Sequence, residues 1–179
     1  VNVNIADPSD VEHIDIATCD GVGLMRTEFL FGGEGGLPDE ETQLAAYAKV
    51  LDWAGGKPVT IRTVDAGGDK PVPGFTLDET NPFLGVRGIR LSLARPDVFR
   101  VQARALLRAA ARGQLKVMFP MVAVPEEYRR ARAIFEKEAE KLAGEGIAHK
   151  MPPLGIMVEV PSVAVAPELL AEAAFFSIG

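Results

Sequence analysis

Short apolar runs alternate with helix-like segments along the whole chain, and this alternation constrains the fold more than any other feature of the sequence. The apolar runs are residues 1–5, 21–27, 58–65, 115–122, 154–160 and 175–179. Neighbouring strands that are separated by a helix pair in parallel, because the helix carries the chain back to the edge where the first strand began. The sequence therefore predicts an α/β fold with a parallel sheet.

The segments between these runs show helix start and stop residues. A first helix is expected from Asp7-Pro8 to Gly21, because Asp caps helices and Pro favours their first position. The other helices are expected from Pro38 to Gly55-Gly56 and over 98–113, 125–146 and 162–173, with a mixed loop and short helix over 81–97. The apolar faces of the second and fourth helices comprise Leu44, Tyr47 and Leu51, and Tyr128, Ala131, Phe135, Ala139 and Leu142.

Two architectures satisfy this pattern. The strands are apolar almost throughout, which is typical of a sheet that is covered on its faces. A doubly wound sheet and a (β/α)8 barrel both fit the order of elements. No repeat or linker divides the sequence, so we expect residues 1–179 to form one domain.

The composition excludes several classes of protein. The 179 residues are 47% apolar and 25% charged, with a net charge of −6, which disfavours a general nucleic-acid binder. No apolar stretch is long enough to span a bilayer, and the single cysteine, Cys19, points to the reducing cytosol. The last residues, "FFSIG", lie inside an apolar run, so we expect this chain to be part of a longer protein.

Polar residues stand at or near the carboxyl ends of three apolar runs. Arg26 closes "GVGLMRT", Arg62 and Asp65 lie in "VTIRTVD", and Glu159 lies near the end of "LGIMVEV". In barrels and open α/β sheets alike, ligands bind at the carboxyl edge of the strands. We therefore expect Arg26, Arg62 and Glu159 to converge in space.

The chemistry of this set favours a phosphorylated ligand. Arginine offers a planar fork of donors that suits phosphate or carboxylate, and a carboxylate such as Glu159 can hold Mg²⁺ together with phosphate oxygens and water. A structural alternative stays open, in which Glu28 pairs with Arg26 or Asp65 with Arg62. Arg87 and Arg90, in "GVRGIR", either line the site or hold loops in place.

Other candidate motifs have simpler interpretations. Neither "GGEGG" nor "AGGDK" has the P-loop spacing, so both are expected to be turns or flexible loops. No group of residues has the spacing of a zinc site. His13 and His149 stand in polar segments and are expected to be solvated, and Cys19 is expected to serve in packing.

Six segments together resemble one family. The segments "GVGLMRTEFLF", "IRTVDAGGDK", "NPFLGVRGIR", "KVMFPMV", "GIMVEVP" and "FFSIG" stand in the order that they take in enzyme I of the bacterial phosphoenolpyruvate:sugar phosphotransferase system. The resemblance covers essentially the whole chain. Pyruvate phosphate dikinases and phosphoenolpyruvate synthases share the layout, but "RTEFLF" and the short spacing between segments favour enzyme I.

The resemblance implies a phosphoenolpyruvate-binding (β/α)8 barrel, of which about six of the eight strands are present. Enzyme I phosphorylates its own histidine with phosphoenolpyruvate and Mg²⁺ and passes the phosphoryl group to the carrier protein HPr. By this resemblance Arg26 and Arg62 grip the phosphate, Arg87 is a further substrate-binding candidate, and Glu159 binds Mg²⁺. It further implies a cytoplasmic homodimer that associates through this domain.

Several functional residues of enzyme I have no counterpart here. The acceptor histidine belongs to an upstream domain, while an Asn-Asp pair, a further arginine and a proton-donating cysteine follow the last segment; Cys19 is not that cysteine. We therefore expect the isolated chain to lack turnover. Two other classes stay open, namely a metal-dependent lyase or aldolase on a related barrel, which would not need both "RTEFLF" and "IRTVDAGGDK", and a non-enzymatic binding or regulatory module.

Overall fold

The computed structural model describes residues 1–32, 36–68, 72–76 and 85–179. Parts of the segments "GGEGG", "AGGDK" and "NPFLGVRGIR" lie outside these described residues. The predictions made for those parts concern residues 33–35, 69–70 and 81–84.

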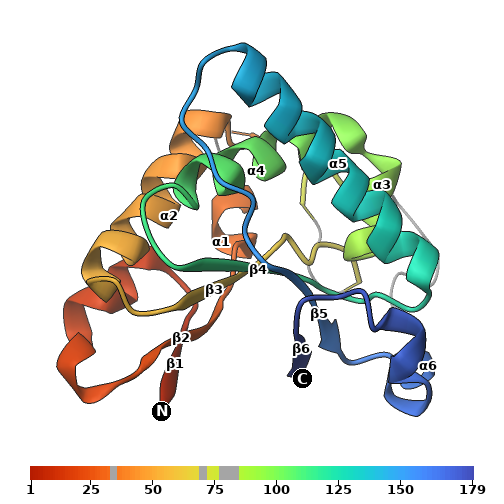
Figure 1. Cartoon of the computed structure of the whole chain (residues 1–179), viewed down its shortest axis with the longest axis horizontal. Coiled ribbons are helices and arrows are strands. Elements are labelled where there is room, and N and C mark those ends of the chain that lie inside the picture. The colour runs from red at the N-terminus through yellow and green to blue at the C-terminus, as the bar shows by residue number, and fades with distance from the viewer. Residues whose placement is uncertain (33–35, 69–71, 77–84) are drawn as a thin grey trace.

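A single parallel sheet organises the described chain. Its six strands follow one another in chain order, and every neighbouring pair is parallel. The strands are β1 (Asn2–Ile5), β2 (Gly21–Met25), β3 (Val59–Arg62), β4 (Leu115–Phe119), β5 (Leu154–Val158) and β6 (Phe176–Ile178). The sheet curls into an arch, with β1 at one end and β6 at the other (Figure 1).

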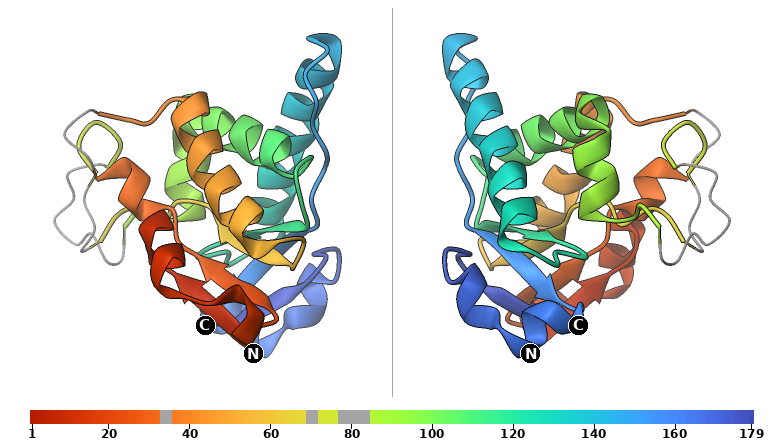
Figure 2. Two further views of the ribbon diagram at one scale, coloured as in Figure 1. Left: turned by 90° about the vertical axis from the view of Figure 1, so that its left-hand side faces the viewer. Right: turned by 90° about the vertical axis from the view of Figure 1, so that its right-hand side faces the viewer.

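The long helices cover the convex side of this arch, as both side views show (Figure 2). The helices are α1 (Glu28–Phe31), α2 (Glu40–Ala54), α3 (Ile89–Ala94), α4 (Pro96–Ala109), α5 (Pro125–Gly144) and α6 (Pro161–Val165). Sequential strand order with helices on one side is the layout of a (β/α)8 barrel, whereas a doubly wound sheet carries helices on both faces. The predicted partial barrel is therefore confirmed, as a half-barrel of six strands.

The main core lies between the convex face and these helices. Outward side chains of the strands, such as Ile61 and Phe119, are fully buried against α2, α4 and α5. Phe119 lies at the centre of an aromatic cluster, with ring centroids 6.3 Å from Phe99, 5.7 Å from Phe135 and 6.0 Å from Tyr128. Edge-to-face contacts of this kind fix how α4 and α5 sit on β4.

The opposite side chains of the strands point into the concave side. The register aligns Arg62 with Met118 and Met118 with Gly155, so these three positions share that face. Gly155 permits a close approach there, because a Cβ atom at this position would lie only 2.6 Å from the Phe175 ring. The concave side thus contains the buried Arg62 and, at Gly155, closely packed side chains.

The predicted helix between Asp7 and Gly21 is wrong in type. The segment forms two 3₁₀ helices, Pro8–His13 and Ile16–Thr18, although Asp7 does cap the first of them by accepting from the Ser9 N–H. The Asp15 carboxylate breaks the segment, because it accepts the Ala17 N–H and so starts a new turn. Short polar side chains that bond to their own backbone compete in this way with α-helix formation.

Other boundaries also differ from the predictions. The strands end earlier than expected, at Met25, Arg62, Phe119 and Val158, and residues 28–31 are helical. The predicted helix over 162–173 is divided into α6 and a 3₁₀ helix, Pro167–Leu170, because proline supplies no N–H to continue α6. None of the helices in the described parts of the chain is long and apolar enough to cross a membrane.

Candidate functional site

Arg62 is the centre of a charged cluster at the carboxyl edge of the sheet. It is the last residue of β3 and is only 6% exposed. Its Nη2 lies 3.3 Å from Oε1 of Glu28 and 3.5 Å from Oδ2 of Asp65, and its Nη1 lies 3.6 Å from the Met157 sulfur on β5. Two acidic side chains and Met157, which lies beyond the adjacent β4, therefore hold this guanidinium in place.

Asp65 connects Arg62 to a second arginine. Both carboxylate oxygens of Asp65 lie 3.4 Å from Nη2 of Arg87. Gly67 makes room for this contact, because a Cβ atom there would lie 2.7 Å from the Arg87 Cβ, and the residue has a φ of +110°. The sequence places glycine where the backbone must pass directly beside the arginine.

Both arginines retain an unpaired donor. The Nε atoms of Arg62 and Arg87 are buried and have no hydrogen-bond partner among the described residues. A buried N–H without an acceptor costs free energy, about 1–3 kcal/mol. Such donors are explained when an anion that accepts from them binds in this site.

Arg26 differs from what the sequence suggested. The apolar run that it closes is typical of a covered strand, but Arg26 is exposed and its neighbour Thr27 is the buried residue. The strand ends at Met25, so the chain turns and directs Arg26 out of the core, while its N–H still donates to the Ile5 carbonyl. Within the described parts of the chain, the Arg26 guanidinium has no hydrogen bond or ion pair.

Glu159 follows β5 at the same edge of the sheet. It is exposed, and its Oε1 accepts the N–H of Met121 at 2.7 Å. Met121 has a φ of +58°, a strained conformation for this residue that directs its N–H towards the carboxylate. The second oxygen of Glu159 has no partner among the described residues, so it can serve as a cation ligand.

One carboxylate oxygen is a small donor set for a metal. The described residues contain no group of three or more His, Cys, Asp or Glu side chains that could hold an ion. Mg²⁺ fits this arrangement nevertheless, because it is usually held by one or two protein carboxylates together with substrate phosphates and water.

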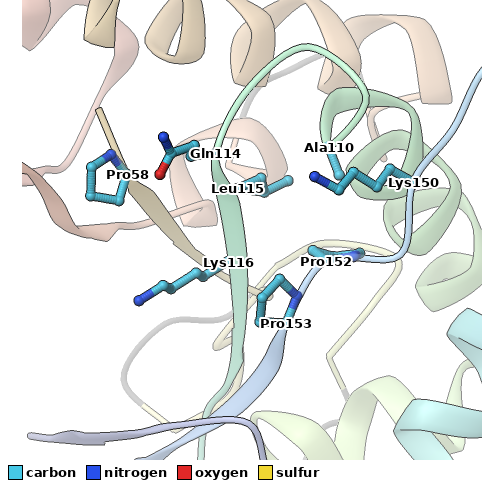
Figure 3. A pocket seen from close by; sticks show the side chains of 8 residues that line it. All are labelled: Pro58, Ala110, Gln114, Leu115, Lys116, Lys150, Pro152 and Pro153. Atoms are coloured by element: carbon cyan, nitrogen blue, oxygen red, sulfur yellow. The ribbon is translucent and has the colours of Figure 1, made fainter. Parts of the chain in front are cut away.

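A cavity of about 190 Å³ lies at the opposite, amino-terminal edge of the strands (Figure 3). It is lined by residues that precede or begin β3, β4 and β5, such as Pro58, Leu115 and Pro153. Its two lysines, Lys116 and Lys150, do not point toward one another in Figure 3. The cavity therefore lacks the convergent polar groups of the Arg62 cluster.

The comparison with known families gives one match that covers the whole chain. Residues 1–179 match the family described as PEP-utilising enzyme, PEP-binding domain, where PEP is phosphoenolpyruvate. The chain belongs to this family. A PEP-binding domain needs groups that hold a phosphate and a carboxylate, which are the anions that arginine binds best.

Individual relatives of the chain agree with the assignment. The chain is 51% identical to a phosphoenolpyruvate-protein phosphotransferase of Priestia megaterium, over 98% of its own length. It is 49% identical to the proteins of the same name from Geobacillus stearothermophilus and Staphylococcus carnosus. These relatives are enzymes by name, and the chain spans about 31% of their length.

The structure connects the predicted residues unevenly. Arg62 and Arg87 share Asp65, whereas Arg26 and Glu159 lie at the same edge and make no hydrogen bond or ion pair with them among the described residues. The open alternative of a protein ion pair is realised for Arg62, which pairs with both Asp65 and Glu28, but Arg26 has no such pair with Glu28. Met157 and Met121 were not predicted, although their positions at strand ends mark them as neighbours of this edge.

Proposed function

We propose that this chain forms the PEP site of a protein that transfers a phosphoryl group from PEP to a protein histidine. This reaction is the first step of the sugar phosphotransferase system. The proposal rests mainly on two arginines at the carboxyl edge of a half-barrel, whose buried Nε atoms lack acceptors among the described residues. Membership of the PEP-utilising family and the names of the relatives support it.

In this reaction the bond between the phosphorus and the enol oxygen of PEP breaks and a bond from phosphorus to the histidine nitrogen forms. Arg26 and Arg62 bind the phosphate oxygens, and Arg87 is the further substrate-binding residue. Their fixed forks stabilise the charge on the transferring group, which is most of what phosphoryl transfer requires of a protein. The enolate that remains is protonated to pyruvate by a donor outside this chain.

Mg²⁺ is the cofactor of the proposed reaction. When bound, it neutralises charge on the phosphate oxygens. Glu159 holds it through the carboxylate oxygen that does not accept from Met121. The Met121 N–H keeps that carboxylate oriented at the edge of the sheet.

The remaining parts of the proposal concern the whole protein. Residues 1–179 form an incomplete barrel domain of a cytoplasmic protein that dimerises through this domain and passes the phosphoryl group to HPr. We expect no turnover by the isolated chain, because His13 is exposed without a described contact to the Arg62 cluster and His149 bonds only locally, to the Ile147 carbonyl.

Calorimetry with PEP and Mg²⁺ tests this function in the intact protein that carries this chain. Arg62→Lys keeps the charge and removes the fork, and we expect it to weaken PEP binding by at least tenfold, about 1.4 kcal/mol. Arg130→Lys is the matched control, because Arg130 is exposed and lies on α5, away from the site. An unmodified protein that does not bind PEP would contradict the proposal, as would equal affinities of the two variants.

A second comparison tests the role of the rest of the protein. We expect the isolated chain to bind PEP more weakly than the intact protein and to produce no pyruvate. Equal affinity of the isolated chain and the intact protein would show that the residues of this chain are sufficient for binding.

A further inference from the structure

A buried hydrogen-bond network of polar side chains joins the outer helices to the ends of β2 and β3. Its members are Gln43 and Tyr47 on α2, Gln102 on α4, and Thr27 after β2, and all four are 0% exposed. Polar side chains of this kind are costly to bury unless every donor and acceptor is satisfied. This network therefore needs an explanation beyond the packing of the helices.

The hydrogen bonds of Gln102 use its whole amide group. Its Nε2 donates to the Tyr47 hydroxyl at 3.2 Å and to Oγ1 of Thr27 at 3.3 Å. Its Oε1 accepts the Val64 N–H at 3.1 Å. A glutamine amide has two N–H donors, and both are occupied here.

The partners leave only one orientation of this amide. The Val64 N–H can only donate, so it must meet the amide oxygen. The Thr27 hydroxyl donates to the Arg62 carbonyl at 3.0 Å, and the Tyr47 hydroxyl donates to Oε1 of Gln43 at 3.0 Å. Both hydroxyl oxygens are therefore left as acceptors for the Gln102 NH₂ group.

The hydroxyl of Tyr47 in this network does not titrate in the ordinary range. Burial raises the pKa of Tyr47 above its usual value of 10.0. Its hydroxyl thus stays protonated and continues to donate to Gln43. The direction of every hydrogen bond in this network is fixed as a result.

These bonds reach the backbone at the proposed phosphate-binding arginine and directly after it. Thr27 bonds the carbonyl of Arg62 itself, and Gln102 bonds the amide of Val64, two residues further on. Thr27 also directly follows Arg26 in the sequence. The chain leaves the sheet ladder directly after β3, so side chains replace part of the hydrogen bonding that fixes a strand.

We propose that Gln102 and Thr27 are positioning residues of the PEP site, which hold the backbone of Arg62 so that its guanidinium meets the phosphate. This inference rests on the function proposed above. Neither residue touches the substrate, and each acts through main-chain groups at the end of β3. A small displacement of that backbone moves the whole arginine fork, and errors of this size are costly in binding and catalysis.

Two variants in the intact protein remove these hydrogen bonds with little change of shape. They are Thr27→Val, which lacks the hydroxyl, and Gln102→Met, which lacks the amide. We expect each to weaken PEP binding by about tenfold in calorimetry. Thr27→Ser restores the hydroxyl, so we expect it to restore the affinity although it loses a buried methyl group.

A control separates positioning from general stability. Leu107 lies on the same helix, α4, and its fully buried apolar side chain makes no hydrogen bond to either strand end. The control variant is Leu107→Ala. We expect it to lower the melting temperature and to leave PEP affinity unchanged. The inference is overturned if Thr27→Val and Thr27→Ser bind PEP equally, or if Leu107→Ala weakens binding as much as Gln102→Met.

Hydrogen exchange gives a test that needs no ligand. We expect the amide of Val64 to exchange faster in Gln102→Met than in Leu107→Ala at equal margin below the melting temperature. If the unmodified protein does not bind PEP, the proposed function fails, and this exchange measurement alone decides whether Gln102 fixes the end of β3. Equal exchange in the two variants would then contradict the positioning role.

Discussion

The carboxylate of Glu28 lies 3.3 Å from the guanidinium of Arg62, and the two residues are 34 positions apart in the sequence. The same oxygen accepts the N–H of Asp65 at 2.9 Å. Glu28 is the first residue of α1, where the helix dipole favours an acidic side chain. The Glu28 carboxylate thus joins the turn after β2 to Arg62 at the end of β3 and to Asp65 in the loop that follows.

Removing this carboxylate should destabilise the fold. We expect Glu28→Ala to lower the free energy of unfolding by about 2 kcal/mol, because it leaves the buried Arg62 with a weaker partner and the Asp65 N–H with none. Glu28→Gln should cost less, since its amide oxygen still accepts from Asp65. Urea unfolding measures both values.

Glu140→Ala is the matched control for this measurement. Glu140 is exposed on α5 and has no described hydrogen bond or ion pair, so the variant should stay within about 0.5 kcal/mol of the unmodified chain. Equal effects at Glu28 and Glu140 would show that the contact with Arg62 contributes nothing to stability.

Arg26 and Arg62 should respond differently to substitution by alanine. Arg26 is exposed and unpaired within the described residues, so Arg26→Ala should change the unfolding free energy by no more than about 0.5 kcal/mol. Its binding role is a proposal, and by that role the same variant should lose PEP affinity. Arg62→Ala should lose both stability and PEP affinity, because it leaves the Glu28 carboxylate without its cation and Asp65 with Arg87 alone.

Calorimetry and thermal melting of the two variants, carried out in the intact protein, check this contrast. A large loss of stability in Arg26→Ala would show that Arg26 has a structural partner. Unchanged PEP affinity in that variant would exclude it from the site.

The edge at which the charged residues gather was predictable from the sequence. Arg62 and Glu159 each stand where an apolar run ends, and parallel strands bring those ends to one edge. The fold class followed in the same way from the alternation of runs and helices. The choice between a barrel and a doubly wound sheet did not follow, because it depends on which side of the sheet each helix occupies.

Individual contacts were harder to predict, because they depend on where a strand stops. Arg26 lies in an apolar run, but β2 ends one residue earlier and places Thr27 in the core instead. Glu138 shows the same limit, since it lies on the charged face of α5 and is nevertheless only 2% exposed, with its Oε2 3.8 Å from Nη1 of Arg104 on α4. Periodicity locates a helix face, whereas these contacts depend on the neighbouring helix.

Gly67 should be more sensitive to substitution than another glycine with positive φ. Gly67→Ala would force a Cβ atom to 2.7 Å from the Arg87 Cβ and 3.0 Å from its Cα, at a φ of +110°. Gly74 has a φ of +76° and no heavy atom within 4 Å of the corresponding position. Gly74→Ala therefore carries the backbone cost alone, about 1 kcal/mol.

We expect Gly67→Ala to lower the free energy of unfolding by at least about 1 kcal/mol more than Gly74→Ala, because backbone atoms must move as well. Parallel denaturation curves of the two variants measure the difference. If Gly74→Ala proved equally or more destabilising, the close contact with Arg87 would not explain why position 67 is glycine.

The start of α2 should make the stability of the fold depend on pH. The Asp39 carboxylate accepts the Thr42 N–H at 2.8 Å, and its hydrogen bonds with Thr42 lower the pKa of Asp39 below its ordinary value of 3.8. A group with a lowered native pKa contributes stability above its unfolded value, and this contribution is lost as the pH falls through the native value. The loss from Asp39 should therefore appear below about pH 4.

Asp39→Asn isolates this contribution, because asparagine also caps a helix but does not titrate. We expect the unmodified chain to lose more unfolding free energy than Asp39→Asn between about pH 5 and pH 3. Chemical denaturation at a series of pH values measures the two curves. Glu140→Gln is the control, because Glu140 is an exposed acid that has no described hydrogen bond. A pH dependence of Asp39→Asn that is as steep as that of the unmodified chain would place the acid-sensitive carboxylates elsewhere in the fold.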